Sequence, residues 1–153
     1  MRAIGLDVGE QRIGVAVSDE SGLLTAPHGV VRRNSTTFDE ILAIVADVGA
    51  RAIVVGLPLM MRGGREGPQA AAVRAFGEAL AAHTDLPVEF YDERLTTVMA
   101  ERTLQEQGRK AGKNRAARER RREHVDALAA AIILQSWLDH RRLNAPRAQL
   151  PDD

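Results

Sequence analysis

Hydrophobic and polar residues alternate with a period of two at the start of the chain. The alternation runs through residues 3–9 and, after a short turn, through residues 13–18. Because a period of two is typical of β-strands, the sequence predicts a hairpin over residues 2–19. The segment 22–33 can supply a third strand, and Pro27 within it indicates a sheet edge or a bend.

Apolar residues at helical spacing predict several helices further along the chain. The predicted helices cover residues 35–49, 69–83, 96–108 and 123–142. Ser35 or Thr36 is expected to cap the first of them, and Gly49 is expected to end it. The last helix is predicted to turn one apolar face toward the core. That face consists of Val125, Leu128, Ala129, Ile132 and Ile133.

Two apolar stretches between these helices predict further strands. Residues 52–58 form a continuous apolar run, which is typical of a strand buried on both faces, and residues 87–93 form the second strand. An antiparallel hairpin set is thus followed by strands that alternate with helices, an order that implies parallel pairing. The sequence predicts an α/β fold with a mixed sheet of about five strands, flanked by helices. We expect a single domain over residues 1–153.

The length and composition favour one globular domain in a reducing compartment. The chain has 153 residues, 44% of them hydrophobic, which is enough for one core but short for two. It has no cysteine, so disulfides, thiolate metal sites and cysteine nucleophiles are excluded. We see neither a signal peptide nor an apolar stretch long enough to cross a bilayer. A cytoplasmic protein that does not bind membranes is expected.

Charge is segregated along the chain. The sequence contains 21 basic and 21 acidic residues, and zero net charge alone would argue against nucleic-acid binding. Residues 109–122, however, contain eight basic residues and one acid, Glu119. The run is predicted to bind a phosphate backbone, and its second half, 115–122, to extend the final helix on contact; a solvated face is the alternative. The basic residues are Arg109, Lys110, Lys113, Arg115, Arg118, Arg120, Arg121 and Arg122.

Asp7 is an unusual residue for the interior of a predicted strand. Aspartate is depleted in strands, and an unpaired carboxylate inside a sheet is costly. The other residues on its face of the hairpin are small, which lets a helix or a ligand backbone approach closely. They are Ala3, Gly5, Gly9, Gly14, Ala16 and Ser18. On the pattern alone, Asp7 could also cap a turn or pair with Arg12.

Two further acidic positions lie in other predicted elements. Asp92 and Glu93 end the last predicted strand, where sites collect in α/β sheets, and Asp126 borders the apolar face of the last helix. Acids from three elements repel one another unless a cation lies among them, and Mg²⁺ or Mn²⁺ prefers such oxygen ligands. Two such ions about 4 Å apart can drive phosphodiester hydrolysis. A surface ion pair with Arg94, or a helix-dipole role for Asp126, explains these acids equally well on spacing alone.

Two weaker signals lie near these positions. His124, two residues before Asp126, could assist proton transfer, although a lone histidine is more often exposed or structural. The Gly-rich segment 62–67 lacks the Lys-Ser/Thr ending of a phosphate-binding loop. A turn before a helix is the better interpretation of that segment.

Four motifs occur in order between residues 3 and 139: "GLDVGEQRIGVAVSD", "VVGLP" followed by a Gly-rich loop, "DERLTT" and "VDALAA". In order and spacing they resemble the YqgF/RuvX family. The resemblance implies an RNase H-like fold and a nuclease, either a Holliday-junction resolvase or a pre-16S rRNA nuclease. It also implies that Asp7, Glu93 and Asp126 are the catalytic acids and bind Mg²⁺ or Mn²⁺. Asp92 is the weaker, accessory candidate, because strand alternation turns it away from the side of Glu93, although alternation often fails at a strand end.

The expected function is metal-dependent hydrolysis of a structured nucleic acid, with processing of the 5′ end of pre-16S rRNA as the leading interpretation. RNA is the favoured partner and DNA the alternative; a pre-ribosomal particle is a candidate partner, and the chain is expected to be a monomer or a homodimer. A non-catalytic nucleic-acid-binding assembly factor is the alternative from another class. The "GLDVG" motif also resembles the phosphate loop of actin-like sugar kinases and chaperone ATPases. Those proteins need two such lobes, whereas 153 residues supply one.

Overall fold

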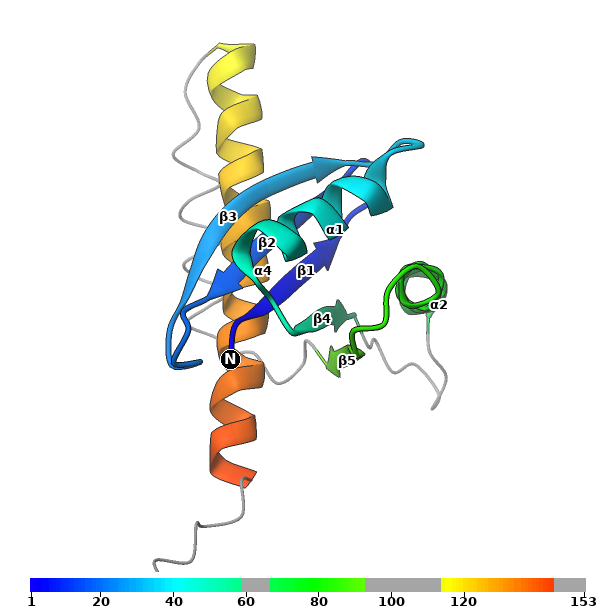
Figure 1. Cartoon of the computed structure of the whole chain (residues 1–153). Helices are drawn as coiled ribbons and strands as arrows, with labels where there is room; N and C mark the ends of the chain where they lie inside the picture. Colours follow the sequence, from blue (N-terminus) through cyan, green and yellow to red (C-terminus); the bar gives the residue numbers. More distant parts are fainter. Residues whose placement is uncertain (59–66, 93–113, 145–153) are drawn as a thin grey trace, which may run out of the picture.

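Five strands form one mixed sheet in the computed structural model, which describes residues 1–58, 67–92 and 114–144 (Figure 1). The strands are β1 (Ala3–Val8), β2 (Arg12–Ser18), β3 (Thr25–Arg32), β4 (Ala52–Leu57) and β5 (Val88–Asp92). Their order in the sheet is β3-β2-β1-β4-β5; β2 is antiparallel to β1 and β3, and β4 is parallel to β1 and β5. The predicted α/β sheet, with an antiparallel set and a parallel half, is confirmed.

Helices cover both faces of this sheet (Figure 1). The helices α1 (Thr37–Val48) and α2 (Pro68–Ala81) lie on one face, and the long helix α4 (Arg115–Asn144) crosses the other. The core on the first face is built from large aliphatic side chains, whereas the core under α4 is rich in alanine. With both faces covered, the acidic residues of the sheet lie toward the ends of its strands, as Asp7 and Asp92 do.

The first helix and the third strand follow their local sequence signals. Gly49 ends α1 in a left-handed conformation with a φ of 69°, as expected. Thr36 occupies the N-cap position, but its side chain makes no capping hydrogen bond within the part of the chain that is described. Instead, Thr37 Oγ1 donates to the carbonyl oxygen of Arg32 at 2.9 Å, which joins the helix start to β3. Pro27 lies in β3, an edge strand, beside a register shift in its pairing with β2.

The final helix begins earlier than the spacing of its apolar residues predicts. It starts at Arg115, well before the predicted range of 123–142. Asn114 caps it, because its Oδ1 accepts a hydrogen bond at 2.7 Å from a backbone N–H of the first turn. Residues 115–122 already belong to α4, so the prediction that they extend the final helix on contact with a target is wrong. This cap and the ion pairs of Glu119 with the strands already hold the segment.

The face that α4 turns to the sheet also differs from the predicted one. The predicted stripe is only half-buried at Val125, Leu128, Ala129 and Ile132, and buried at Ile133. The buried residues of the helix are Ala127, Ala130, Ala131, Ile133, Leu134, Trp137 and Leu138. The reason lies in the sheet, where glycines and alanines leave room only for a closely packed helix that turns its own alanines inward.

The helix α4 approaches the β1–β2 hairpin within backbone contact. A Cβ atom placed on Gly14 would lie 2.0 Å from the backbone oxygen of Asp126. A Cβ atom on Gly5 would lie 2.7 Å from Cβ of Leu134. Both separations are well inside van der Waals contact, so the helix can lie here only because these residues are glycines. The prediction that small residues on this face admit a helix is confirmed.

Some predicted segments fall outside the described residues: the helix at 96–108, most of the Gly-rich segment 62–67, Glu93, and residues 109–113 of the basic run. Gly67 and Pro68 open α2, so a helix follows this segment as predicted. Within the described ranges, no helix has both the length and the apolar character needed to cross a membrane.

Replacing Gly14 by alanine is expected to destabilise the fold by about 3 kcal/mol, as overpacking of a core does. The new methyl group would overlap the backbone of α4, which cannot retreat without exposing the alanine-rich core. Urea denaturation measures the loss. Gly67→Ala is the matched control, because a Cβ atom there meets nothing within 4 Å; its effect is expected to stay below about 1 kcal/mol. Equal stability of Gly14→Ala and wild type would contradict the close approach.

Candidate metal centre and nucleic-acid interface

Strand β1 places Asp7 on the face of the sheet that α4 covers. Asp7 shares this face with Ala3 and Gly5 by strand alternation, and both of these residues lie under the helix. Its partner in the antiparallel pair is Gly14 of β2. Asp7 itself is half-buried. The hairpin therefore brings one carboxylate beneath the helix, beside a residue that has no side chain.

Asp126 comes to the same place from the helix. Its backbone oxygen lies against Gly14, the cross-strand partner of Asp7. Directly paired residues on one face of neighbouring strands have Cβ positions about 5 Å apart, so Asp7 and Asp126 are neighbours around Gly14. The Asp126 side chain is 30% exposed. The structure thus places the backbone of Asp126 against the cross-strand partner of Asp7, and these are two of the three acids that the sequence singles out.

The last strand ends toward the same edge of the sheet. Asp7 and Asp92 both lie toward the carboxyl ends of their strands. Because β1, β4 and β5 are parallel, these ends lie at the same edge of the sheet. Asp92 is half-buried and pairs with Leu57. Tyr91 packs in the core under α4, so alternation turns Asp92 toward the opposite face. Glu93 follows outside the described residues, and its role as the third acid stays a prediction.

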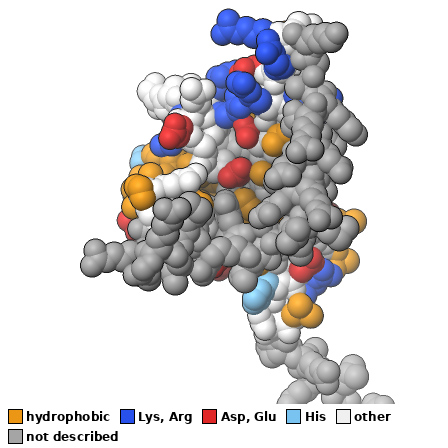
Figure 2. Space-filling model, turned by 180° about the vertical axis from the view of Figure 1, so that it is seen from behind, with side chains coloured by type: hydrophobic (Ala, Val, Ile, Leu, Met, Phe, Trp, Pro, Cys, Tyr) orange, Lys and Arg blue, Asp and Glu red, His pale blue; other side chains and the backbone are white. Residues whose placement is uncertain are grey.

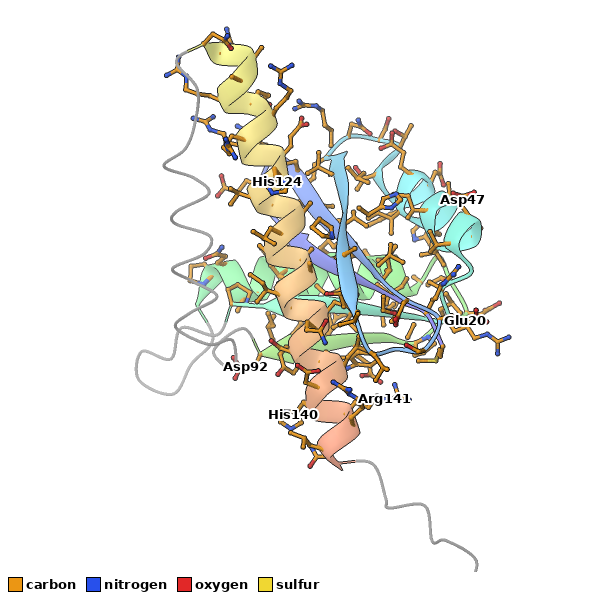
Figure 3. The ribbon with its side chains drawn as sticks, turned by 90° about the vertical axis from the view of Figure 1, so that its left-hand side faces the viewer. Glu20, Asp47, Asp92, His124, His140 and Arg141 are labelled. Carbon is orange, nitrogen blue, oxygen red and sulfur yellow. The ribbon has the colours of Figure 1, made fainter. Side chains whose placement is uncertain are left out.

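His124 does not join this pair of acids. It is exposed, and it precedes Asp126 on α4 by two residues. Two residues correspond to about 200° around a helix, so the two side chains leave α4 on different sides. Figure 3 shows His124 on α4, far from Asp92 at the end of β5. Its assistance in proton transfer stays a prediction that this placement does not favour.

Arg12 has a larger role here than the sequence indicates. Its Nε donates a hydrogen bond to Oδ2 of Asp126, and its Nη1 lies 3.4 Å from Oε1 of Glu119. Only 15% of its side chain is exposed. From the sequence, Arg12 is considered only as a partner of Asp7, whereas these two contacts are made with α4. The sequence signal that could indicate these contacts is the spacing of Glu119 and Asp126, which lie two turns apart on one side of the helix.

Arg32 extends these contacts into a group of charges, which we call the hairpin–helix network. Its Nη2 lies 3.1 Å from Oε1 of Glu119 and 3.3 Å from Oε1 of Glu123. Arg12 and Arg32 are themselves cross-strand partners. The network consists of Arg12, Arg32, Glu119, Glu123 and Asp126. Since β2 and β3 supply the arginines and α4 supplies the acids, the network fixes the first half of α4 to these two strands.

The first turns of α4 carry a concentration of positive charge. Figure 1 shows this end of the helix projecting past the strands, and Figure 2 shows Arg side chains gathered there above acidic ones. Because Glu119 contacts the hairpin, this end presents mainly arginines to a ligand. Arg109, Lys110 and Lys113 lie outside the described residues. The described members, which we call the basic arm, are Arg115, Arg118, Arg120, Arg121 and Arg122.

The donor set around Gly14 suits a divalent cation with oxygen ligands. Asp7 and Asp126 supply carboxylate oxygens, which Mg²⁺ and Mn²⁺ prefer. Across the described parts of the chain, no group of three or more His, Cys, Asp or Glu side chains is arranged to hold a metal ion. Two carboxylates nevertheless match Mg²⁺, which keeps several waters and commonly binds proteins through one or two carboxylates.

Comparisons with known proteins agree on one family. The family model described as "RuvX: Holliday junction resolvase" matches residues 1–140. A protein of Chloroflexus aggregans named "Putative pre-16S rRNA nuclease" is 48% identical over 141 residues, covering 91% of this chain and 94% of the relative. A protein of the same name from Symbiobacterium thermophilum is 46% identical over 150 residues, covering 97% of this chain and 99% of the relative.

Solved structures show the same fold at much lower sequence identity. The structure of T. thermophilus RuvC in complex with Holliday junction substrate matches with a TM-score of 0.57 at 18% identity, covering 94% of this chain and 97% of that one. The fowlpox virus Holliday junction resolvase matches with a TM-score of 0.51 at 8% identity, covering 92% of this chain and 99% of that one. These likenesses confirm the RNase H-like fold that the sequence motifs imply.

Glu119 is predicted to make the hairpin–helix network sensitive to acid. The hydrogen bond from Arg32 lowers the pKa of Glu119; burial opposes this shift, and the charges of Arg12, Arg32 and Arg122 add to it. A carboxylate whose pKa is lowered by folding stabilises the fold at neutral pH. That contribution is lost as the pH falls below the ordinary glutamate range and through the lowered value.

Glu119→Gln is therefore expected to lower the melting temperature at neutral pH, by a margin that shrinks toward about pH 3. Thermal melts across this range measure the margin. Glu78→Gln, at an exposed position of α2, is the control and is expected to shift the melting temperature little at any pH. A margin for Glu119→Gln that stays constant with pH would contradict the role assigned to its charge.

Proposed function

The chain belongs to the RuvX family, a family of nucleases, and we propose that it hydrolyses phosphodiester bonds of structured RNA with Asp7, Glu93 and Asp126 as metal-binding catalytic acids. The proposed substrate is the 5′ end of pre-16S rRNA, in line with the name of the curated relatives. A Holliday junction in DNA is the second candidate, because the matching family model carries that description. A pre-ribosomal particle is the partner that the first substrate implies.

The convergence of Asp7 and Asp126 on Gly14 carries this proposal. Two half-buried carboxylates that face one site would repel each other, and a divalent cation that binds only the folded chain would remove the repulsion. Arg12 offsets part of the charge through its hydrogen bond to Asp126. Glu93 is included because it follows Asp92 directly in the sequence, and Asp92 lies at the sheet edge toward which Asp7 also lies.

Two groups of residues have separate roles in the proposed hydrolysis: one binds the cations and the other binds the nucleic acid. Divalent cations, when bound, supply a water of lowered pKa and stabilise the leaving oxygen. Asp7, Glu93 and Asp126 would hold these ions. The basic arm binds the phosphate backbone and brings it toward carboxylates that would otherwise repel it. Water is the nucleophile in this mechanism, so no side chain forms a covalent adduct with the nucleic acid.

Asp7→Asn is expected to abolish cleavage and to leave the fold intact. Asparagine keeps the size of the side chain but removes the charge that a divalent cation requires. Without metal, the variant should be at least as stable as wild type, because one partner of the carboxylate repulsion is gone. Cleavage is measured with Mn²⁺ on an RNA that carries the pre-16S 5′ end and on a four-way DNA junction. Asp47→Asn, an exposed change on α1 (Figure 3), is the control and should cut like wild type.

The two substrates separate the candidate functions. Cleavage of the RNA but not of the junction supports the proposed substrate, and the reverse result supports the resolvase. If the wild-type chain binds both substrates with Mn²⁺ present and cuts neither, a non-catalytic binding role replaces both. Cleavage by Asp7→Asn at the wild-type rate would show that the active site lies elsewhere.

Replacing arginines of the basic arm is expected to weaken nucleic-acid binding similarly for all sequences. The variant carries alanine at Arg118, Arg120, Arg121 and Arg122. Alanine keeps the helix, and removing one arginine–phosphate interaction reduces the slope of log affinity against log salt by about one unit. Fluorescence anisotropy at several salt concentrations measures affinity and slope together. Mn²⁺ binding should survive, because the acids are untouched.

A second variant with the same loss of charge is the control for the basic arm. It replaces four arginines toward the opposite ends of α4 and the sheet: Arg2, Arg51, Arg141 and Arg142. Its affinity and salt dependence are expected to change less than those of the arm variant. If the arm variant keeps both the affinity and the slope of wild type, the arm is only a solvated face.

A further inference from the structure

Arg12 lies where the two parts of the proposed machinery meet. It is the first residue of β2, at the strand end that faces Asp126. One guanidinium contacts two acids of α4: Asp126 through Nε and Glu119 through Nη1. Asp126 belongs to the proposed metal centre, whereas Glu119 lies among the arginines of the basic arm. A single side chain therefore connects the carboxylate that would hold a cation with the segment that would hold the nucleic acid.

The hydrogen bond from Arg12 leaves Asp126 able to bind a cation at the same time. It uses Oδ2 of the carboxylate. An ionised carboxylate has about four acceptor sites distributed over two oxygens, so a guanidinium and a cation can share it. Arg12 thus restrains the Asp126 side chain without having to leave when a cation binds.

Arg12 is also well anchored for such a role. Its strand is paired on both sides, with β1 and with β3. Oε1 of Glu119, which lies 3.4 Å from Nη1 of Arg12, also lies 3.1 Å from Nη2 of Arg32. The negative charge of Glu119 lies beside the guanidinium and offsets part of the repulsion between Arg12 and a cation at Asp126.

We propose that Arg12 is a positioning residue that fixes Asp126 for divalent-cation binding, and that Glu119 holds Arg12 in place for this role. The inference rests on the proposed metal-dependent function. Groups that orient metal-binding side chains commonly contribute about 10- to 100-fold in metal affinity. A simple counter-charge would act in the opposite direction, because a fixed positive charge beside the acids competes with a cation.

The Mn²⁺ affinity of the full chain, measured by isothermal titration calorimetry, tests this role independently of cleavage. Arg12→Gln and Arg12→Lys are both expected to weaken Mn²⁺ binding by about 10- to 100-fold. Lysine keeps the charge but lacks the planar fork that contacts Asp126 and Glu119 together. Glu119→Gln should weaken binding by a smaller factor, since it removes only the anchor. Arg51→Gln, which removes a positive charge at an exposed position, should leave the affinity unchanged.

Unchanged or tighter Mn²⁺ binding by Arg12→Gln would overturn the proposal and make Arg12 a counter-charge. Wild-type affinity in Arg12→Lys would overturn it as well, because charge alone would then suffice. If Arg12→Gln does not fold, as judged by circular dichroism, Arg12→Lys and Glu119→Gln decide the question. Failure of the proposed function has a different signature: wild type and Asp7→Asn would bind Mn²⁺ equally, and the role of Arg12 would fall with it.

Discussion

The contact between α4 and the glycines of the β1–β2 hairpin determines where the candidate functional groups of α4 lie relative to the sheet. Gly14 has no side chain, and the backbone of Asp126 occupies the space that a Cβ atom would take. Gly5 also lacks a Cβ atom, and Leu134 packs into the space that this atom would take further along the helix. A larger residue at either position would lift the helix, and the helix carries both acids that Arg12 contacts as well as the basic arm. The electrostatics of the site therefore depends on packing at two glycines.

The hairpin and its carboxylate can be predicted from the sequence because their signals are local. A period of two specifies which residues share a face with Asp7, and the small size of those residues indicates that another backbone approaches there. Strand β4 is equally predictable, because all of its residues are apolar or glycine and all are buried. Gly49 ends α1 through a backbone conformation that glycine adopts at little cost.

The start and the inner face of α4 cannot be predicted from the helix alone. The sheet below decides the inner face: Ala130 fits over the hairpin, while the larger Leu128 is only half-buried. The pairing of Arg12 with Asp126 joins residues 114 positions apart, so no local periodicity reports it. The site is therefore predictable as a set of acids. The arginine that contacts one of them, Arg12, can be recognised only once strands and helix are assembled.

One uninterrupted helix connects the basic arm to an acid of the proposed metal centre. The helix α4 runs from Arg115 to Asn144 and rises about 1.5 Å per residue. Arg118 and Asp126 are therefore about 12 Å apart along its axis, and the hairpin–helix network restrains this end from swinging. With the proposed roles, α4 fixes the distance between the phosphate-binding residues and the metal centre. Helix geometry then sets the separation between the bound phosphates and the bond that is hydrolysed. This separation does not depend on the base sequence of the nucleic acid.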